Sequence, residues 1–160
     1  MAYDPGAENA RLLLRAIRGG LDFAGRSRRT EWLYYVIACA LLQTVVNFTA
    51  GFVLPTAAAA LLSTALWIVL SLPMPALFVR RLHDQNRSGW WAMLLILQIG
   101  PALYFEWLRT HDMTAYLDAV RGFGPIRLAQ VTTSLAILVI VFWRGTVGSN
   151  AYGGDPRLSE

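Results

Sequence analysis

His83 and Asp84 stand side by side in a polar segment, residues 80–89, that separates two long apolar stretches. A histidine next to a carboxylate could work as a general base or a proton relay. Adjacent residues of a loop seldom address one substrate, however, and the nearest hydroxyl, that of Ser88, lacks the glycine-flanked turn of a nucleophile. We therefore expect His83 and Asp84 to cap helices and bond the loop backbone.

Arginines are the second group of residues with binding chemistry, and the chain contains no lysine. The guanidinium group forms forked hydrogen bonds that suit phosphate and carboxylate. Near the ends of the apolar stretches, arginines outnumber the carboxylates of Glu31, Asp84 and Asp155. The surplus favours an anion site, whereas the alternative is a topology signal combined with ion pairs that lock the helix ends. The candidate anion-binding residues are Arg26, Arg29, Arg80, Arg81, His83, Asp84 and Arg87.

Four apolar stretches must position these residues. Of the 160 residues, 56% are hydrophobic and 15% are charged, against about 25% charged in soluble domains. No charged residue occurs from Trp32 to Val79, which is too long for one span of about 20 residues and predicts two spans that turn at Pro55. Pro73 and Pro75 predict a kink or an unwound turn near the end of the second span. The expected spans are 32–53, 57–79, 90–108 and 126–143.

The arginines also predict an orientation. Eleven of the 14 fall before the first span, between the second and third spans, or after the fourth span. The positive-inside rule places these segments, and both termini, in the cytoplasm. The fold class is therefore an all-α integral membrane four-helix bundle in the bacterial inner membrane. Its expected parts are an N-terminal amphipathic segment (1–24), the transmembrane domain (25–156) and a polar tail (157–160).

The N-terminal segment predicts a short amphipathic helix within residues 8–23. Arginines recur on one side at helical spacing and leucine and isoleucine fill the other, and Gly19-Gly20 would end the helix. One interpretation is an interfacial helix on the cytoplasmic surface, held by apolar burial and anionic headgroups. The other is a soluble helix that packs on the protein itself.

Metal and cofactor chemistry has little support in the sequence. Cys39 is the single cysteine, which excludes a disulfide within the chain and a cysteine-based metal site. His83 and His111 are expected on opposite sides of the membrane. Phosphate-loop, dinucleotide, zincin and haem-attachment motifs are absent. We expect no cofactor and no metal.

Amide side chains lie near the middle of two apolar stretches: Gln43 in the first, with Asn47 one helical turn later, and Gln98 in the third. Amides at this depth usually bond across helices and add on the order of 1 kcal/mol each. The alternative is a polar lining of a small oligomeric channel or transporter.

The polar segments at the expected cytoplasmic face carry a family resemblance. Their patterns are F-x-G-R-x-R-R-x-E-W, R-R-L-H-D-x-x-R-S-G-W-W and G-x-N-x-Y-G-x-D-P. Over residues 20–156 the chain resembles the DUF805 family, which implies a four-span inner-membrane protein and no established activity. Asn86 stands where the family usually has glycine, but asparagine tolerates the left-handed backbone conformation. In a compact bundle the three segments must be neighbours, with a structural polar network of Glu31, Asn150, Tyr152, Asp155, Gln43, Asn47 and Gln98.

The leading hypothesis is a non-catalytic inner-membrane module that binds an anionic lipid headgroup or a protein partner through the arginines. The alternatives are the channel or transporter above and an enzyme acting on a lipid-linked or phosphorylated substrate. Candidate partners are membrane lipids, anionic lipids among them, a second copy of the chain, or another membrane protein. The net charge of +4 could indicate nucleic acid, but the arginines flank apolar stretches, so we expect no nucleic acid.

Overall fold

The computed structural model describes residues 5–122 and 124–158, so the ends of the predicted terminal segments (1–4 and 159–160) lie outside the described residues. The described residues form helices and no strand, apart from one bridge pair, Asn150–Gly153. The predicted all-α class is thereby confirmed. The chain divides into two compact units: the first is Met1–Gly89 with Arg144–Glu160, and the second is Trp90–Trp143.

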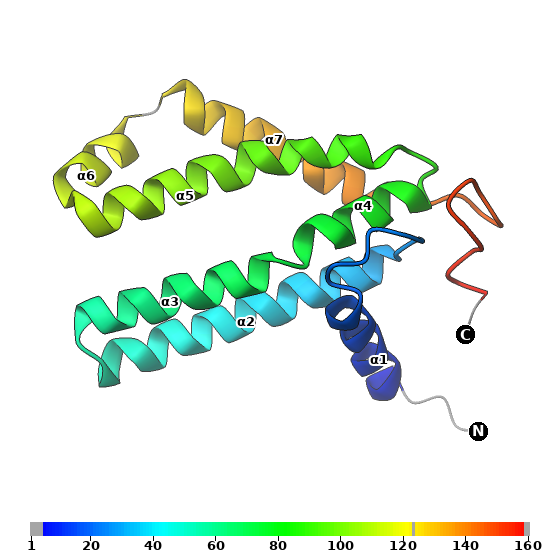
Figure 1. Cartoon of the computed structure of the whole chain (residues 1–160), viewed down its shortest axis with the longest axis horizontal. Helices are drawn as coiled ribbons and strands as arrows, with labels where there is room; N and C mark the ends of the chain where they lie inside the picture. The colour runs from blue at the N-terminus through cyan, green and yellow to red at the C-terminus, as the bar shows by residue number, and fades with distance from the viewer. Residues whose placement is uncertain (1–4, 123, 159–160) are drawn as a thin grey trace. The chain divides into compact units, whose positions relative to one another are not determined.

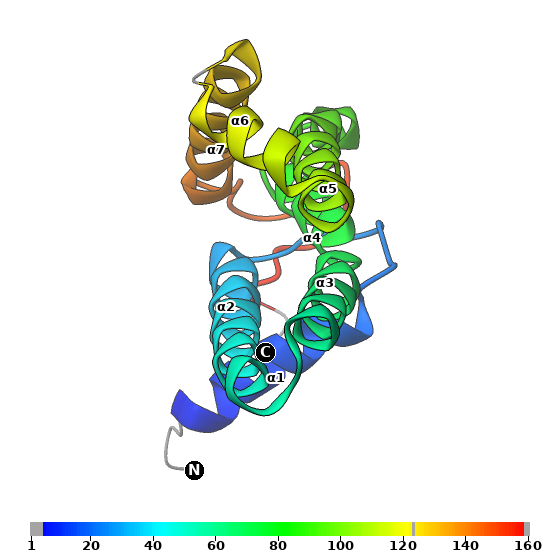
Figure 2. The ribbon, with the colours of Figure 1, turned by 90° about the vertical axis from the view of Figure 1, so that its left-hand side faces the viewer.

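The first unit contains four helices and the C-terminal segment (Figure 1). They are α1 (Pro5–Arg18), α2 (Arg29–Val53), α3 (Thr56–Ser71) and α4 (Met74–Asp84). Pro55 caps the start of α3 directly after the end of α2, so the two long helices form an antiparallel pair (Figures 1 and 2). The turn predicted at Pro55 is confirmed.

A break separates α3 from α4 at Leu72 and Pro73. Proline has no backbone N–H and cannot continue the hydrogen-bond ladder of α3. The last turn tightens instead, because the Leu72 N–H donates to the Val69 carbonyl at 3.3 Å. The break predicted from the prolines is confirmed, and after it α4 contacts α2 as well as α3.

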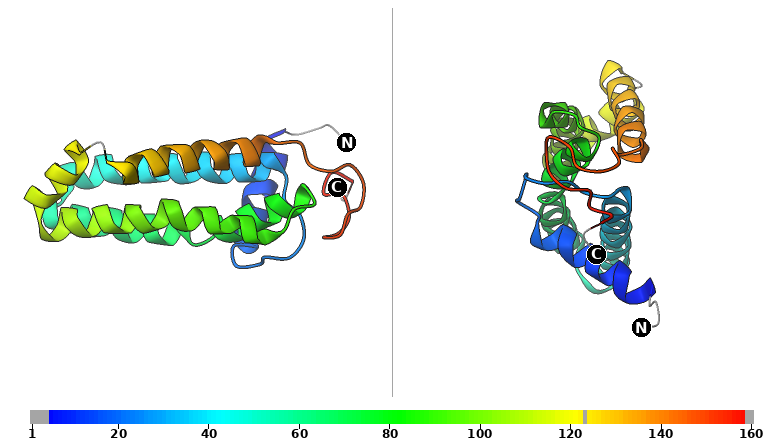
Figure 3. Two further views of the ribbon diagram at one scale, coloured as in Figure 1. Left: turned by 90° about the horizontal axis from the view of Figure 1, so that it is seen from above. Right: turned by 90° about the vertical axis from the view of Figure 1, so that its right-hand side faces the viewer.

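The second unit contains η1 (Gly89–Leu95), which leads into α5 (Ile96–His111), followed by α6 (Met113–Arg121) and α7 (Pro125–Phe142). Within this unit α5 and α7 lie side by side (Figure 3). The Asp112 side chain accepts a hydrogen bond from the Ala115 N–H and so caps the start of α6.

Four helical stretches are long and apolar enough to cross a membrane: Arg29–Val53, Thr56–Asp84, Gly89–His111 and Pro125–Phe142. They coincide with the four predicted spans to within a few residues. Large apolar side chains stand exposed along them, for example Phe52, Leu61 and Leu138. Exposure of this kind suits contact with lipid acyl chains.

The core of the first unit joins α1 to α2 and α4. Ala16 and Leu77 are fully buried and Tyr35 is nearly so, and the Tyr35 hydroxyl donates to the Leu70 carbonyl at 2.8 Å. Helix α1 runs across α2 rather than along it (Figure 2).

The mid-span amides bond across helix pairs. The Gln43 amide donates to the hydroxyl of Ser63 on α3 at 3.2 Å and to the Asn47 side chain at 2.9 Å. The Gln98 amide donates to the Gln130 carbonyl at 2.7 Å and to the Ser134 hydroxyl at 2.9 Å, both on α7. These bonds agree with the structural interpretation, in which each amide joins two helices of one unit.

Replacing Gln98 with leucine should lower the free energy of unfolding in detergent by about 1 kcal/mol, because the bonds from α5 to α7 are lost. Thr132→Val is the matched control, since within the described part of the chain the Thr132 hydroxyl bonds only carbonyls of its own helix. Unfolding in mixed micelles measures both variants. Equal stabilities of Gln98→Leu, Thr132→Val and the parent chain would contradict the structural interpretation.

Candidate anion-binding site

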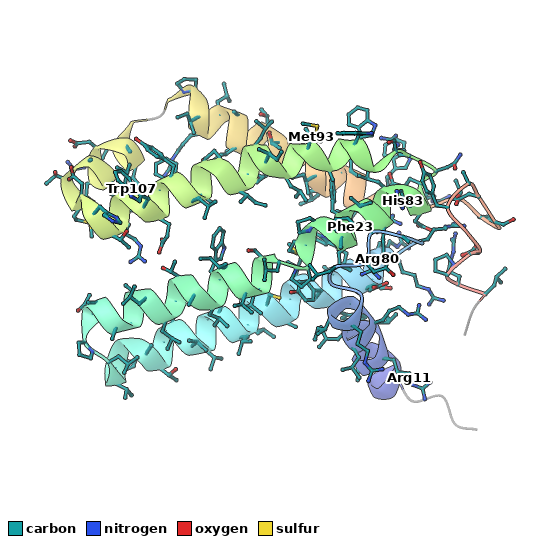
Figure 4. All side chains as sticks on the ribbon, in the orientation of Figure 1. Arg11, Phe23, Arg80, His83, Met93 and Trp107 are labelled. Atoms are coloured by element: carbon teal, nitrogen blue, oxygen red, sulfur yellow. The ribbon has the colours of Figure 1, made fainter. Side chains whose placement is uncertain are left out.

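Three segments far apart in the sequence meet at the end of α4. The Ser27 N–H donates to the Arg80 carbonyl at 3.1 Å, which attaches the loop before α2. The Thr146 N–H donates to the Asp84 carbonyl at 2.8 Å, which attaches the C-terminal segment. Figure 4 shows Arg80 and His83 in this region of α4. The predicted convergence of the three motif segments is confirmed.

The carboxylate of Asp84 is the centre of this cluster. Arg26 donates to Oδ1 through Nε at 3.1 Å and Nη2 at 2.9 Å, which is a forked contact. Arg81, one helical turn before Asp84, donates to Oδ2. The side chains of all three residues are at most 6% exposed. Both carboxylate oxygens are therefore bound by arginine.

The remaining donors of Arg26 bind backbone carbonyls of the C-terminal segment. Nη2 donates to the Thr146 carbonyl and Nη1 to the Gly148 carbonyl, both at 2.6 Å, and Nη1 also lies 3.3 Å from the Gly153 carbonyl. Gly148 and Gly153 have φ of 80° and 129°, which side-chain-bearing residues rarely adopt. These glycines allow the segment to wrap around one guanidinium group.

Gly145 is required by close approach to Asp84. A Cβ atom at position 145 would lie 1.8 Å from Asp84 Oδ2, an oxygen that Arg81 already holds. The chain can therefore cross the carboxylate here only because glycine has no side chain.

His83 makes further contacts with the C-terminal segment. The Asn150 amide donates to the His83 carbonyl at 2.9 Å and to the Thr146 hydroxyl at 2.8 Å. The His83 ring stacks on the Tyr152 ring with centroids 3.9 Å apart, and its Nδ1 lies 3.2 Å from the Gly25 carbonyl. His83 and Asp84 are thus engaged with backbone, arginines and an aromatic ring. The expectation that they lie in a loop is wrong, because the helix resumes after Pro73 and α4 runs to Asp84.

A second buried ion pair involves Glu31 and Arg80, whose side chains are 1% and 7% exposed. The Arg80 Nη2 lies 3.7 Å from Glu31 Oε1, and the Ser27 hydroxyl donates to Oε2 at 3.0 Å. A Cβ at Gly19 would lie 2.5 Å from Arg80 Nη1, so the guanidinium group covers this glycine.

A neighbouring cavity of about 540 Å³ is lined by five arginines, of which Arg81 is bound to Asp84. The lining residues are Arg28, Arg29, Thr30, Arg81, Asp84, Arg144, Gly145, Val147, Pro156 and Arg157. Arg28 donates to the Pro156 carbonyl, and Arg157 to the Asp155 carboxylate and the Thr146 carbonyl. Among the described residues, no hydrogen bond or ion pair engages the exposed side chains of Arg29 and Arg144.

The structure thus sorts the predicted anion-site residues. It brings Arg29, Arg81 and Asp84 together at the cavity. Arg26, Arg80, His83 and Arg87 are not among the lining residues. The predicted set missed the lining arginines Arg28, Arg144 and Arg157. Arg28 lies in the first motif segment and Arg157 directly follows the third, whereas Arg144 lies four positions before the third.

Asp155 organises the last turn of the C-terminal segment. The Arg157 side chain and N–H, and the Gly148 N–H, all donate to its carboxylate. These bonds, led by the Arg157 side chain, hold the pKa of Asp155 well below its ordinary value. The same pairing raises the pKa of Arg157.

The four apolar helices and the buried arginine–carboxylate cluster define a multi-pass helical membrane protein. The chain belongs to the family described as "Protein of unknown function (DUF805)", which it matches over residues 20–154. Asn86 adopts the left-handed conformation, with φ of 56°. The left-handed conformation expected at Asn86 is therefore confirmed.

Three relatives come from Escherichia coli strain K12. The chain is 29% identical to "Inner membrane protein YhaI" over 92% of this chain and 96% of the relative. It is 26% identical to "Inner membrane protein YhaH" over 91% of this chain and 95% of the relative. It is 30% identical to "Uncharacterized protein YiiR" over 85% of this chain and 86% of the relative. No solved structure matches the chain. These names and the four candidate spans confirm the predicted localisation in the bacterial inner membrane.

Arg26→Lys keeps the charge but removes the forked contact. We expect a loss on the order of 3 kcal/mol in the free energy of unfolding, because a buried carboxylate loses part of its pairing. Hydrogen exchange should also accelerate at the Thr146 and Gly148 amides. Arg121→Lys, at an arginine with a 76% exposed side chain, is the control. Unchanged exchange in Arg26→Lys would show that this side chain does not hold the segment.

The depressed pKa of Asp155 predicts the pH dependence of the C-terminal segment. A lowered native pKa stabilises the folded segment above the ordinary value of 3.8, and this stabilisation disappears as pH falls from there through the native pKa. NMR should show the Gly148 and Arg157 amides keeping their native shifts at pH 5 and losing them only below the ordinary value. In Asp155→Asn these shifts should be altered at every pH. A parent chain whose segment titrates above pH 5 would contradict the pairing.

Proposed function

We propose that the protein is a non-catalytic inner-membrane module that binds the phosphate of an anionic lipid headgroup in the arginine-lined cavity. The observation that carries the proposal is the set of five arginines around one cavity of about 540 Å³. Among the described lining residues the single carboxylate, that of Asp84, is already bound by Arg26 and Arg81. The lining therefore presents uncompensated positive charge.

Electrostatics favour an anion at this place. Arg29 and Arg157 both act on Arg81 as like charges. Like charges at short range are unfavourable where water is partly excluded. A phosphate between Arg29 and Arg144 would accept forked hydrogen bonds from both and offset this repulsion.

The position of the cavity in the chain favours a lipid as the source of the phosphate. Arg29 is the first residue of α2, and Arg144 follows the end of α7 by two residues. Both arginines therefore lie at an end of a candidate span, the level at which headgroups are found. By the positive-inside rule this end faces the cytoplasm, where anionic lipids attract arginine.

The test is the retention of anionic lipid by Arg29→Gln/Arg144→Gln, measured by mass spectrometry of the purified protein and by titration with phosphatidylglycerol in nanodiscs. Hydrogen bonds to charged groups contribute about 1.5–3 kcal/mol each, and 1.4 kcal/mol is tenfold in affinity. We expect binding to weaken at least about tenfold. Inorganic phosphate, titrated separately, distinguishes a free anion from a headgroup.

Arg121→Gln/Arg127→Gln is the matched control. It removes the same charge from two residues of the second unit that are not among the lining residues. The control should retain lipid as the parent chain does. An equal loss of lipid in both double variants would mean that only the net charge matters, and this would overturn the proposal. Unchanged lipid binding by Arg29→Gln/Arg144→Gln would overturn it as well.

A further inference from the structure

We infer that α1 lies in the membrane interface and that its exposed apolar side contacts the acyl chains and headgroups of an anionic leaflet. The inference does not depend on the arginine-lined cavity. It rests on three stripes that follow one another around the helix, each with a different surrounding.

The first stripe faces the protein. At about 100° per residue, Leu12 and Ala16 point in nearly the same direction, and they are 4% and 0% exposed. Ala16 packs with Tyr35 of α2 and Leu77 of α4, and Leu13 packs against the edge of this core. Helix α1 is thus attached to the protein along one side.

The second stripe is apolar and uncovered. Around the helix Ile17 follows Leu13, and Leu14 comes next, almost opposite Leu12 and Ala16; Leu14 and Ile17 are 48% and 54% exposed. Leu21 and Phe23 continue the apolar surface beyond the helix and are also exposed. Leu12, Leu13 and Ala16 are thus used against the protein, whereas Leu14 and Ile17 are not. Four large exposed apolar residues within ten positions indicate a surface that water does not cover.

The third stripe is basic. Arg18 and Arg11 follow Leu14 around the helix and are exposed, and Arg15 comes next. Arg15 is close enough to Glu31 for an electrostatic interaction, which places it on the border with the protein. The order around α1 is therefore protein, apolar surface, arginines. Arginines beside a lipid-facing stripe can extend to anionic headgroups while their methylene groups cover apolar surface.

The attachment point sets the level of α1 in the bilayer. The core that receives α1 includes Trp32 and Cys39, both in the N-terminal part of α2, the first candidate span. Figures 2 and 3 show α1 lying across that end of α2. A helix attached across the entry of a span meets the boundary between headgroups and acyl chains, which is the environment of an interfacial helix.

The test measures the depth of α1 directly. In a Cys39→Ala background, single cysteines at Leu14, Ile17 and Arg11 are labelled with a nitroxide, and the protein is reconstituted into vesicles containing phosphatidylglycerol. Power-saturation EPR compares collision with oxygen, which enriches in acyl chains, and with a water-soluble nickel chelate. Labels at positions 14 and 17 should lie about 5–10 Å below the headgroups, and the label at position 11 should be accessible to nickel.

Several outcomes would overturn the inference. Equal nickel accessibility at positions 17 and 11 would mean that α1 faces water. Shielding of positions 14 and 17 from both reagents would mean that a second protein surface covers the stripe. Unchanged depth in purely zwitterionic vesicles would remove the role of anionic headgroups. Adding Arg29→Gln/Arg144→Gln should leave the depth of the labels on α1 unchanged. The experiment therefore distinguishes a failure of the proposed lipid binding in the cavity from a failure of this inference.

Discussion

The buried carboxylate of Asp84 is the constraint on which the rest of the first unit depends. An unpaired carboxylate in this position would be strongly unfavourable. Arg26 and Arg81 supply the pairing, and Arg26 in turn binds carbonyls of the C-terminal segment. Gly145 lets that segment pass directly over the carboxylate. The loop before α2, the end of α4 and the C-terminal segment are far apart in the sequence. They are joined through the Asp84 carboxylate and the arginines that bind it.

The same pairing separates the arginines into two groups. Arg26 and Arg80 are buried and neutralised within the protein, so they act as structural ties between segments. Arg29 and Arg144 are exposed at the cavity, and the only carboxylate among the described lining residues, that of Asp84, is already bound by arginines. The carboxylates of Asp84 and Glu31 are paired with arginines inside the protein. The positive charge of Arg29 and Arg144 at the cavity therefore stays uncompensated among the described residues. This division supports an anion site made of the outer group.

The sequence predicted features that depend on local chemistry. Apolar length predicted the four spans, the prolines predicted the break at Pro73, and the tolerance of asparagine predicted the left-handed turn at Asn86. It could not predict that Arg26 points inward while Arg29 points outward. That choice depends on partners more than 100 positions away, such as Gly148, whose carbonyl Arg26 binds. The contact of Gly145 with Asp84 likewise exists only after the segments have met.

A double-mutant cycle on the free energy of unfolding tests the central role of Asp84 most directly. The cycle compares Arg26→Gln, Asp84→Asn and the double variant in the same detergent. The two groups form a buried, hydrogen-bonded charge pair. We therefore predict that the double variant loses less free energy of unfolding than the two single variants lose in sum. The expected coupling is at least about 1 kcal/mol. Additive losses would contradict the claim that this pair organises the three segments.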